Sequence, residues 1–197
     1  MRNIELFIIG GSAGALDPLQ EVLSGLTPDL GMPIVIVLHQ NSTHPSLLSR
    51  LLAHNCNRPV SEPDDKQPLI RGAVYVAPPN YHVLIERDRT ISLSVDEPVN
   101  FSRPSIDVLF ESAADAFGPT LVALVLSGSN ADGAQGLRRV ADAGGIALVQ
   151  SAASSAYPTM PAAAAQLVPT AQRVAPRDVA SSIARLSGLP SHSEPMP

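Results

Sequence analysis

Short apolar runs that do not alternate with polar residues constrain the fold of this 197-residue chain more than any other feature. Four of them are clear: Leu6 to Ile9, Ile34 to Leu38, Leu121 to Leu126 and Ile146 to Val149. A strand that is apolar at every position suits a parallel sheet, because both faces of such a sheet are covered by helices. The sequence therefore predicts an α/β fold with a doubly wound, mostly parallel sheet and helices on both faces.

Amphipathic segments between several of these runs supply the helices. The clearest covers residues 105–117, where apolar side chains recur at helical spacing directly after Pro104, a residue type common at helix starts. Weaker helical patterns cover residues 16–26, 46–53, 134–143 and 176–186. These segments provide the crossover connections that parallel strands require.

The middle of the chain has a different pattern. Residues 55–72 are polar and proline-rich, and three short strand-like runs follow at residues 73–77, 82–86 and 90–95. The turn-like residues Arg87-Asp88-Arg89 join the last two, which predicts an antiparallel β-hairpin insertion. We expect one domain over residues 1–186 and a flexible tail over residues 187–197, where no periodicity remains.

Composition excludes several classes of protein. Thirteen Lys and Arg against 18 Asp and Glu give a net charge of −5, which argues against a nucleic-acid partner. Cys56 is the only cysteine, so an internal disulfide is impossible. The start of the chain is too short for a signal peptide, and no apolar run approaches the ~20 residues of a bilayer-spanning helix. We therefore expect a cytoplasmic protein without membrane insertion.

Three residues that are common in catalysis follow three of the predicted strands. Ser12 lies in the turn after the first, His39 follows the second, and Asp132 lies in the loop after the third. Ligands of open parallel sheets gather at the carboxyl ends of the strands. One serine, one histidine and one aspartate therefore project toward the same edge of the predicted sheet.

The turn around Ser12 fits the pattern G-x-S-x-G, with Gly10 and Gly14 as its ends. In this pattern the glycines allow a sharp strand-to-helix bend that exposes a nucleophilic hydroxyl. A helix starting near Ala15 would aim backbone N–H groups at an oxyanion. The alternatives are a phosphate-binding turn or a packing turn, although the glycine spacing completes neither of the common nucleotide-binding motifs.

His39 is the candidate base and Asp132 the candidate partner that fixes its tautomer. Taken singly, each has a structural alternative: His39 as a hydrogen-bonded structural histidine, and Asp132 as the N-cap of the helix beginning near Gly133. His39, His44, His54 and Cys56 have no recognised ligand spacing, so we expect no metal and no cofactor.

Several separated motifs, taken together, resemble the catalytic domain of the chemotaxis protein-glutamate methylesterases (CheB type). The resemblance spans almost the whole chain and is carried by IIGGSAGALDPL around Ser12, IVIVLHQNSTHPSLLSRLL around His39, YVAPPNYHVLI at 75–85, RPSIDVLFESAA at 103–114, LVLSGSNADGAQGL at 124–137, and Met160-Pro161. It implies that Ser12, His39 and Asp132 form a Ser-His-Asp triad that hydrolyses glutamate γ-methyl esters. The family also deamidates specific receptor glutamines, and no cofactor is implied.

The resemblance implies a methylated chemoreceptor or receptor-like signalling protein as the partner. The first predicted strand begins near residue 4, which leaves no room before it for the family's receiver domain. We therefore expect no control by phosphorylation within these residues. Two alternatives stay open: regulation by a separate signalling protein, or a stand-alone role in another sensory pathway.

The sequence departs from the family's pattern near the expected oxyanion site. Ala13 follows the nucleophile where threonine is common, Ala15 replaces the second glycine of the usual pair, and Ser129-Asn130 stands in place of Met-Gly. These departures motivate an alternative function, a catalytically impaired module that binds a receptor or a kinase. A nucleotide-binding domain is a third. Arg103 is a candidate for recognising carboxylates on an acidic receptor, with an exposed or capping role as its alternative.

Overall fold

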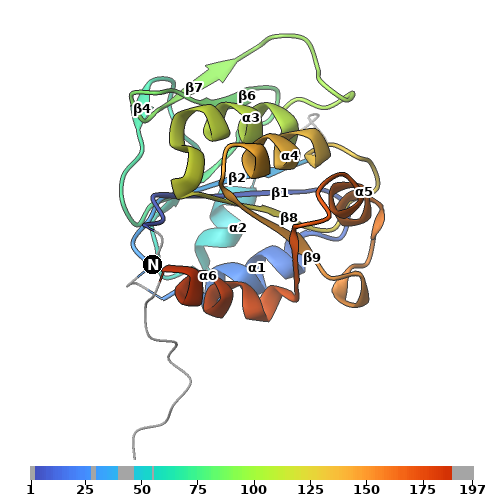
Figure 1. Cartoon of the computed structure of the whole chain (residues 1–197). Helices are drawn as coiled ribbons and strands as arrows, with labels where there is room; N and C mark the ends of the chain where they lie inside the picture. The colour runs from blue at the N-terminus through green and yellow to red at the C-terminus, as the bar shows by residue number, and fades with distance from the viewer. Residues whose placement is uncertain (1–2, 28–29, 40–46, 55, 188–197) are drawn as a thin grey trace, which may run out of the picture.

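A seven-stranded parallel sheet lies at the centre of the molecule (Figure 1), in the computed structural model that describes residues 3–27, 30–39, 47–54 and 56–187. Its strands have the order β10-β9-β8-β1-β2-β5-β3. Their bounds are β1 Leu6–Gly11, β2 Ile34–Leu38, β3 Val60–Ser61, β5 Val74–Val76, β8 Leu121–Val125, β9 Ile146–Gln150 and β10 Gln172–Val174. The predicted doubly wound α/β fold is confirmed.

Helices cover both faces of this sheet. The helices α3 (Ile106–Phe117), α4 (Ala134–Asp142) and α5 (Thr159–Leu167) pack on one face, and α1 (Leu16–Gly25), α2 (Leu48–His54) and α6 (Val179–Ser187) on the other. Short 3-10 turns complete the helical segments: η1 Gly118–Thr120, η2 Ala152–Ser154 and η3 Pro176–Asp178.

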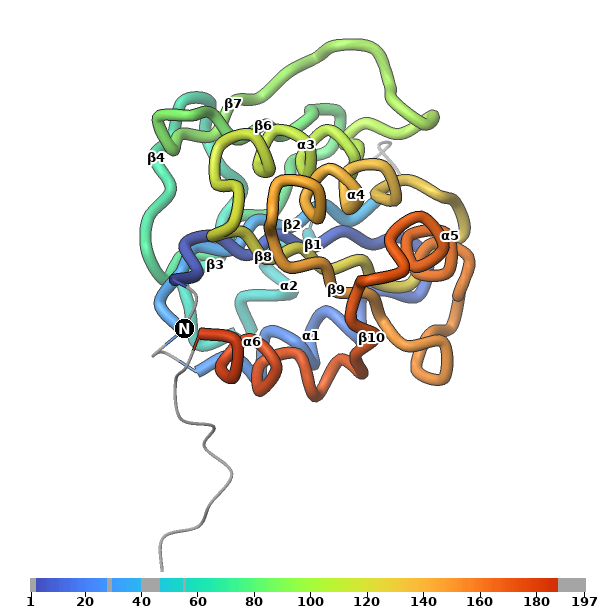
Figure 2. The backbone as a smooth tube through the Cα atoms, in the orientation of Figure 1, coloured from blue at the N-terminus to red at the C-terminus, as the bar shows by residue number. Residues whose placement is uncertain are grey.

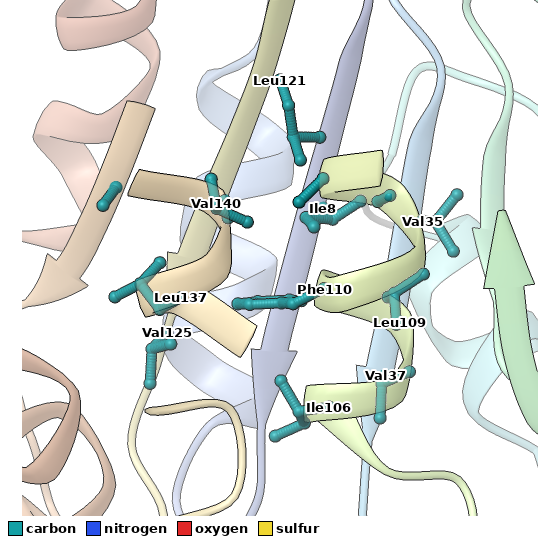
Figure 3. Packing of buried hydrophobic residues seen from close by; sticks show 14 of the residues in the cluster. Ile8, Val35, Val37, Ile106, Leu109, Phe110, Leu121, Val125, Leu137 and Val140 are labelled. Atoms are coloured by element: carbon teal, nitrogen blue, oxygen red, sulfur yellow. The ribbon is translucent and has the colours of Figure 1, made fainter. Parts of the chain in front are cut away.

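The residues of β1 show why its sequence does not alternate. Ile8 packs into the cluster beneath α3 and α4, whereas Phe7 and Ile9 pack into the cluster on the α1 side, and all three are at most 1% exposed. Figure 3 shows the first of these clusters, in which Ile106 and Phe110 of α3 lie over the strands. Burial on both faces therefore requires an apolar residue at every position.

The predicted hairpin is also confirmed. β6 (His82–Ile85) and β7 (Thr90–Ser94) pair antiparallel, and β4 (Gln67–Pro68) adds a third strand to this small sheet. Residues 73–77 behave differently from the other two strand-like runs, because β5 joins the main sheet beside β2. The backbone after β7 then arches across the top of the view before it enters α3 (Figure 2).

The tail prediction is largely untested, because residues 188–197 lie outside the described residues and Ser187 ends α6. The sequence did not indicate β3, β4 or β10, which have two or three residues each and largely lack buried apolar side chains. No helix among the described residues is long and apolar enough to cross a membrane.

Register places the ends of the three central strands together. Gly11 of β1 is opposite Leu38 of β2, and Gly10 is opposite Val125 of β8. The residues that follow these strands therefore leave the sheet at one edge, its carboxyl edge.

Candidate active site

Ser12 lies where the chain leaves β1 for α1. Its backbone N–H donates to the carbonyl of Ser127 (2.9 Å), and the N–H of His39 donates to the carbonyl of Gly11 (3.1 Å). These two bonds hold the ends of β8, β1 and β2 side by side. The backbone alone thus places Ser12 and His39 at neighbouring strand ends.

Two glycines make the turn around Ser12 possible. Gly14 has φ +70°, and a Cβ at this position would approach the ring of Tyr157 to 2.8 Å. A Cβ on Gly10 would overlap the side chain of Ile106 at the start of α3. Any larger residue would therefore push α3 from the sheet or strain the turn.

The Ala13 amide is the first backbone donor after the serine. It has no hydrogen-bond partner among the described residues, and α1 begins three residues later, at Leu16. Its N–H is therefore a candidate donor for an oxyanion formed at Ser12.

His39 and Asp132 form a hydrogen-bonded pair. Nε2 of His39 lies 2.9 Å from Oδ2 of Asp132, and the side chains are 13% and 0% exposed. The pairing uses Nε2, so Nδ1 of His39 is the candidate nitrogen for proton transfer. Within the described residues no hydrogen bond joins His39 to the Ser12 hydroxyl. Contacts of this kind often tighten only when substrate binds.

Asp132 lies at the N-terminus of α3. Oδ2 also accepts the N–H of Ile106 (2.7 Å), and Oδ1 accepts from Ser105 Oγ (2.9 Å), Asn100 Nδ2 (3.0 Å) and the Asp107 N–H (3.2 Å). Burial by itself would raise the pKa of Asp132, but the bonds from His39, Asn100, Ile106 and Ser105 outweigh burial and lower it to about 2. Asp132 is therefore an anion throughout the neutral range.

This placement corrects the structural alternative for Asp132. The N-cap residue of α4 is Gly133, and no side chain caps that helix. Asp132 instead accepts the first N–H groups of α3, a helix that starts 26 residues earlier in the chain. The nearby helix dipole also favours a carboxylate at this position.

A second serine and a second histidine are linked to Asp132 by hydrogen bonds. Ser105 donates its hydroxyl to Asp132, and its backbone N–H donates to Nδ1 of His82 (3.2 Å). Nε2 of His82 in turn donates to the carbonyl of Glu97 (3.1 Å). Because Ser105 is 0% exposed, its hydroxyl orients Asp132 and cannot reach a substrate. The sequence indicated His82 only as the first residue of a strand, so these hydrogen bonds were not predicted.

Asp107 is a further buried carboxylate that the sequence argument missed. Oδ1 accepts the N–H of Gly136 (2.7 Å), and Oδ2 accepts Nδ2 of Asn100 (2.8 Å). Burial, with the charge of Asp132 nearby, raises the pKa of Asp107 to about 6. An acidic residue in the first turn of a helix usually lies in solvent, so its sequence position gave no signal.

A cavity of about 230 Å³ opens beside His39. It is lined by His39, Asn80, Pro98, Phe101, Ser102, Arg103 and Pro104. Arg103 braces its wall, because Nη1 donates to the carbonyls of Val95 (2.7 Å) and Asp96 (2.9 Å). Carboxylate recognition by Arg103 stays a prediction. A second cavity, of about 290 Å³, lies near α5, and no triad residue lines it.

The metal set considered from the sequence is only partly described, because His44 lies outside the described residues. Among the residues that are described, no group of three or more His, Cys, Asp or Glu side chains could hold a metal ion.

A family model and similar curated proteins all point to one protein family. Residues 7–183 match the family model of the CheB methylesterases. A protein of Leptospira interrogans is 44% identical over 162 residues, which cover 82% of this chain and 84% of the relative. The protein-glutamate methylesterase/protein-glutamine glutaminase of Azospirillum brasilense is 36% identical over 166 residues, and the match covers 42% of that longer protein.

A solved structure has the same fold. The Thermotoga maritima CheB methylesterase catalytic domain superposes with a TM-score of 0.87 over 93% of this chain and 98% of that one. Sequence identity is 22%, so this likeness concerns the fold.

Proposed function

This chain belongs to the CheB methylesterase family, and we propose that Ser12, His39 and Asp132 carry out its hydrolytic reaction. Its activity is that of a protein-glutamate methylesterase/protein-glutamine glutaminase. The observation that carries the residue assignment is the 2.9 Å bond between His39 and a fully buried Asp132, at the sheet edge where Ser12 emerges. The nucleophile, base and orienting carboxylate then have the roles of a serine-hydrolase triad.

The proposed reaction has two stages. Oγ of Ser12 attacks the γ-carbonyl carbon of a glutamate methyl ester while Nδ1 of His39 takes its proton. Collapse of the tetrahedral intermediate breaks the bond to the methoxy oxygen, and His39 returns the proton so that methanol leaves. Water then attacks the acyl-enzyme with His39 as base again, which releases the glutamate carboxylate and Ser12. With a glutamine substrate, ammonia leaves in place of methanol.

Two features support these steps electrostatically. Asp132 stays ionised at neutral pH because its pKa is lowered to about 2, so it stabilises the imidazolium that forms on His39. The Ala13 amide supplies a donor for the negative oxygen of the intermediate. An alanine at this position retains the backbone donor, so its departure from the family's threonine does not remove it.

The CheB family acts on methylated chemoreceptors, and we assign this chain a methylated chemoreceptor or receptor-like signalling protein as substrate. A cytoplasmic setting is part of the same proposal. A separate regulatory signalling protein as second partner stays a prediction.

The test is covalent trapping of the nucleophile combined with turnover. A fluorophosphonate probe is expected to label the peptide that contains Ser12, and Ser12→Ala is expected to abolish labelling and methanol release from a methylated receptor. A loss of at least about 10³-fold is typical for a triad nucleophile. Ser105→Ala is the matched control, because that hydroxyl also bonds Asp132 but is buried.

Ser105→Ala is expected to slow turnover and to leave labelling at Ser12. Labelling of any other serine, or full hydrolysis by Ser12→Ala, would contradict the assignment. Receptor binding by the wild-type chain without turnover of any methylated substrate would instead favour the impaired binding module.

A further inference from the structure

A tight turn over residues 99–102 reaches the buried end of the active site. Val99 and Ser102 exchange two backbone hydrogen bonds, of 3.1 and 2.9 Å. The two residues between them have left-handed backbones, with φ 52° at Asn100 and φ 60° at Phe101. Non-glycine residues seldom adopt this conformation, and where it occurs the surrounding structure holds it in place.

The Asn100 side chain provides the anchor. Its Nδ2 donates to Oδ2 of Asp107 (2.8 Å) and to Oδ1 of Asp132 (3.0 Å). Both carboxylates are at most 5% exposed. A single amide nitrogen with two protons therefore bridges two buried acidic groups. Among the described residues, Asn100 is the only side chain that donates to both.

We propose that Asn100 is a positioning residue for the hydrolysis: its amide bridges Asp107 and Asp132 and holds the Asp132 carboxylate in register with His39. This inference rests on the proposed roles of His39 and Asp132. Asn100 touches no reacting atom, because it lies on the Oδ1 side of Asp132 and His39 bonds Oδ2. It acts on the reaction through the carboxylate alone.

The charges around the bridge explain why a neutral donor is needed there. Asp107 and Asp132 face each other, with His39 on the far side of Asp132 and His82 reached through Ser105. Glu111 on α3 adds a further negative charge.

The neighbouring helix supplies no cation to this cluster. It contributes only the Gly136 N–H, because Arg138 and Arg139 of α4 pair at the surface with Asp142 and Asp115. Two buried like charges repel each other, and a shared donor offsets part of that repulsion; without the donor, one of the two groups shifts or takes up a proton.

Loss of the Asn100 amide therefore has two consequences. Asp132 loses one of its donors and becomes free to move away from His39. In addition, the protonation balance between Asp107 and Asp132 changes. The first consequence lowers kcat, and the second moves the acid limb of the pH profile of hydrolysis.

The test is Asn100→Gly in the whole chain, with methanol release from a methylated receptor measured across pH. Glycine accepts φ 52° without strain, so the variant removes the side chain and retains the turn. Val99→Ala is the matched control, because it shortens a partly exposed side chain in the same turn and no hydrogen bond to either carboxylate involves that side chain.

For Asn100→Gly we expect kcat to fall about tenfold with KM changed less than about twofold, and the acid limb of kcat/KM to move by about half a pH unit or more. Val99→Ala is expected to move neither. Asn100→Ser, whose hydroxyl can donate to one carboxylate only, is expected to be intermediate, and it replaces the glycine variant if that variant fails to fold.

The inference is overturned if Asn100→Gly matches Val99→Ala in both kcat and acid limb, or if only KM changes. Its failure is distinct from failure of the proposed function. If only the role of Asn100 is wrong, Ser12→Ala still abolishes turnover. If the proposed function is wrong, Ser12→Ala retains turnover.

Discussion

The two sides of the active site are held in place by different means. Ser12 and His39 are positioned by backbone hydrogen bonds between strand ends, of 2.9 and 3.1 Å. Asp132 is positioned mainly by donors from residues 100–107, an irregular segment and the first turn of α3. Sheet topology thus brings the two proposed reacting groups together, whereas side-chain chemistry outside the sheet sets the charge and orientation of the carboxylate.

The largest effect is expected for Asp132→Ala, which removes the carboxylate that bonds both His39 and the start of α3. We expect kcat to fall by roughly 10³- to 10⁴-fold, because His39 loses both its orientation and its counter-charge. Methanol release measures this loss. Stability is also expected to fall, by about 2–4 kcal/mol, because the first donors of α3 lose their buried acceptor.

Urea unfolding measures the stability change. If Asp132→Ala retains full turnover, His39 does not depend on this carboxylate and the pairing has no catalytic role.

A second variant tests whether the two sides communicate through packing. Ile106 begins α3, donates its N–H to Asp132, and contacts the position where Gly10 lacks a Cβ. Ile106→Ala is expected to cost about 2–4 kcal/mol in urea unfolding, as for other large-to-small core changes. We also expect several-fold lower kcat, because the first turn of α3 loses its contact with β1.

Leu109→Ala is the matched control, since Leu109 lies one turn along the same helix and is equally buried. It is expected to cost similar stability with a smaller change in kcat (Figure 3 shows both side chains). Equal losses of kcat in the two variants would show that general loosening, and not the start of α3, affects the site.

Much of the first side could be predicted from the sequence. The strands that carry Ser12 and His39 are continuous apolar runs, and strand ends of a parallel sheet share an edge, so the rule for the fold also indicated where these proposed site residues lie. Asp132 was found in the same way, but its α3 contacts were not, because they join residues more than 20 positions apart.

The residues that hold Asp132 in place show no periodic pattern in the sequence. Asn100, Ser105 and His82 act through specific hydrogen bonds to residues far along the chain, and these partners are fixed only when the hairpin and α3 pack together. From the sequence, Ser105 before α3 is indistinguishable from an ordinary helix cap, and His82 at the start of β6 from an ordinary strand residue. Without the fold, nothing separates these residues from many others like them.

A third prediction concerns the ionisation of Asp107, the second buried carboxylate beside Asp132. Because the pKa of Asp107 is raised from 3.8 to about 6, the folded protein binds a proton more tightly there than the unfolded chain. Ionisation of Asp107 therefore disfavours folding, and its contribution falls as pH rises from about 4 to 6, by roughly 3 kcal/mol at most. Asp107→Asn is expected to flatten this decline.

Urea unfolding at several pH values measures the slope. The Asp132 contribution has the opposite sign, since its pKa is lowered to about 2, and it is lost only below about pH 4. The two windows are therefore separable. An unchanged slope between pH 4 and 6 in Asp107→Asn would show that Asp107 does not carry this charge.

The smallest effect of a substitution is expected at the surface. Ion pairs there have contact distances similar to that of the buried His39–Asp132 pair, but solvent surrounds them. Arg138 and Asp142 lie four residues apart on α4 with a 2.9 Å contact, yet both side chains are about half exposed. Solvent screens such a pair, so Arg138→Ala is expected to change the unfolding free energy by less than about 0.5 kcal/mol and to leave kcat unaltered. If urea unfolding shows that Arg138→Ala lowers the unfolding free energy by more than about 1 kcal/mol, burial matters less than contact distance for the ion pairs of this molecule. The expected difference between buried and exposed charges would then be wrong.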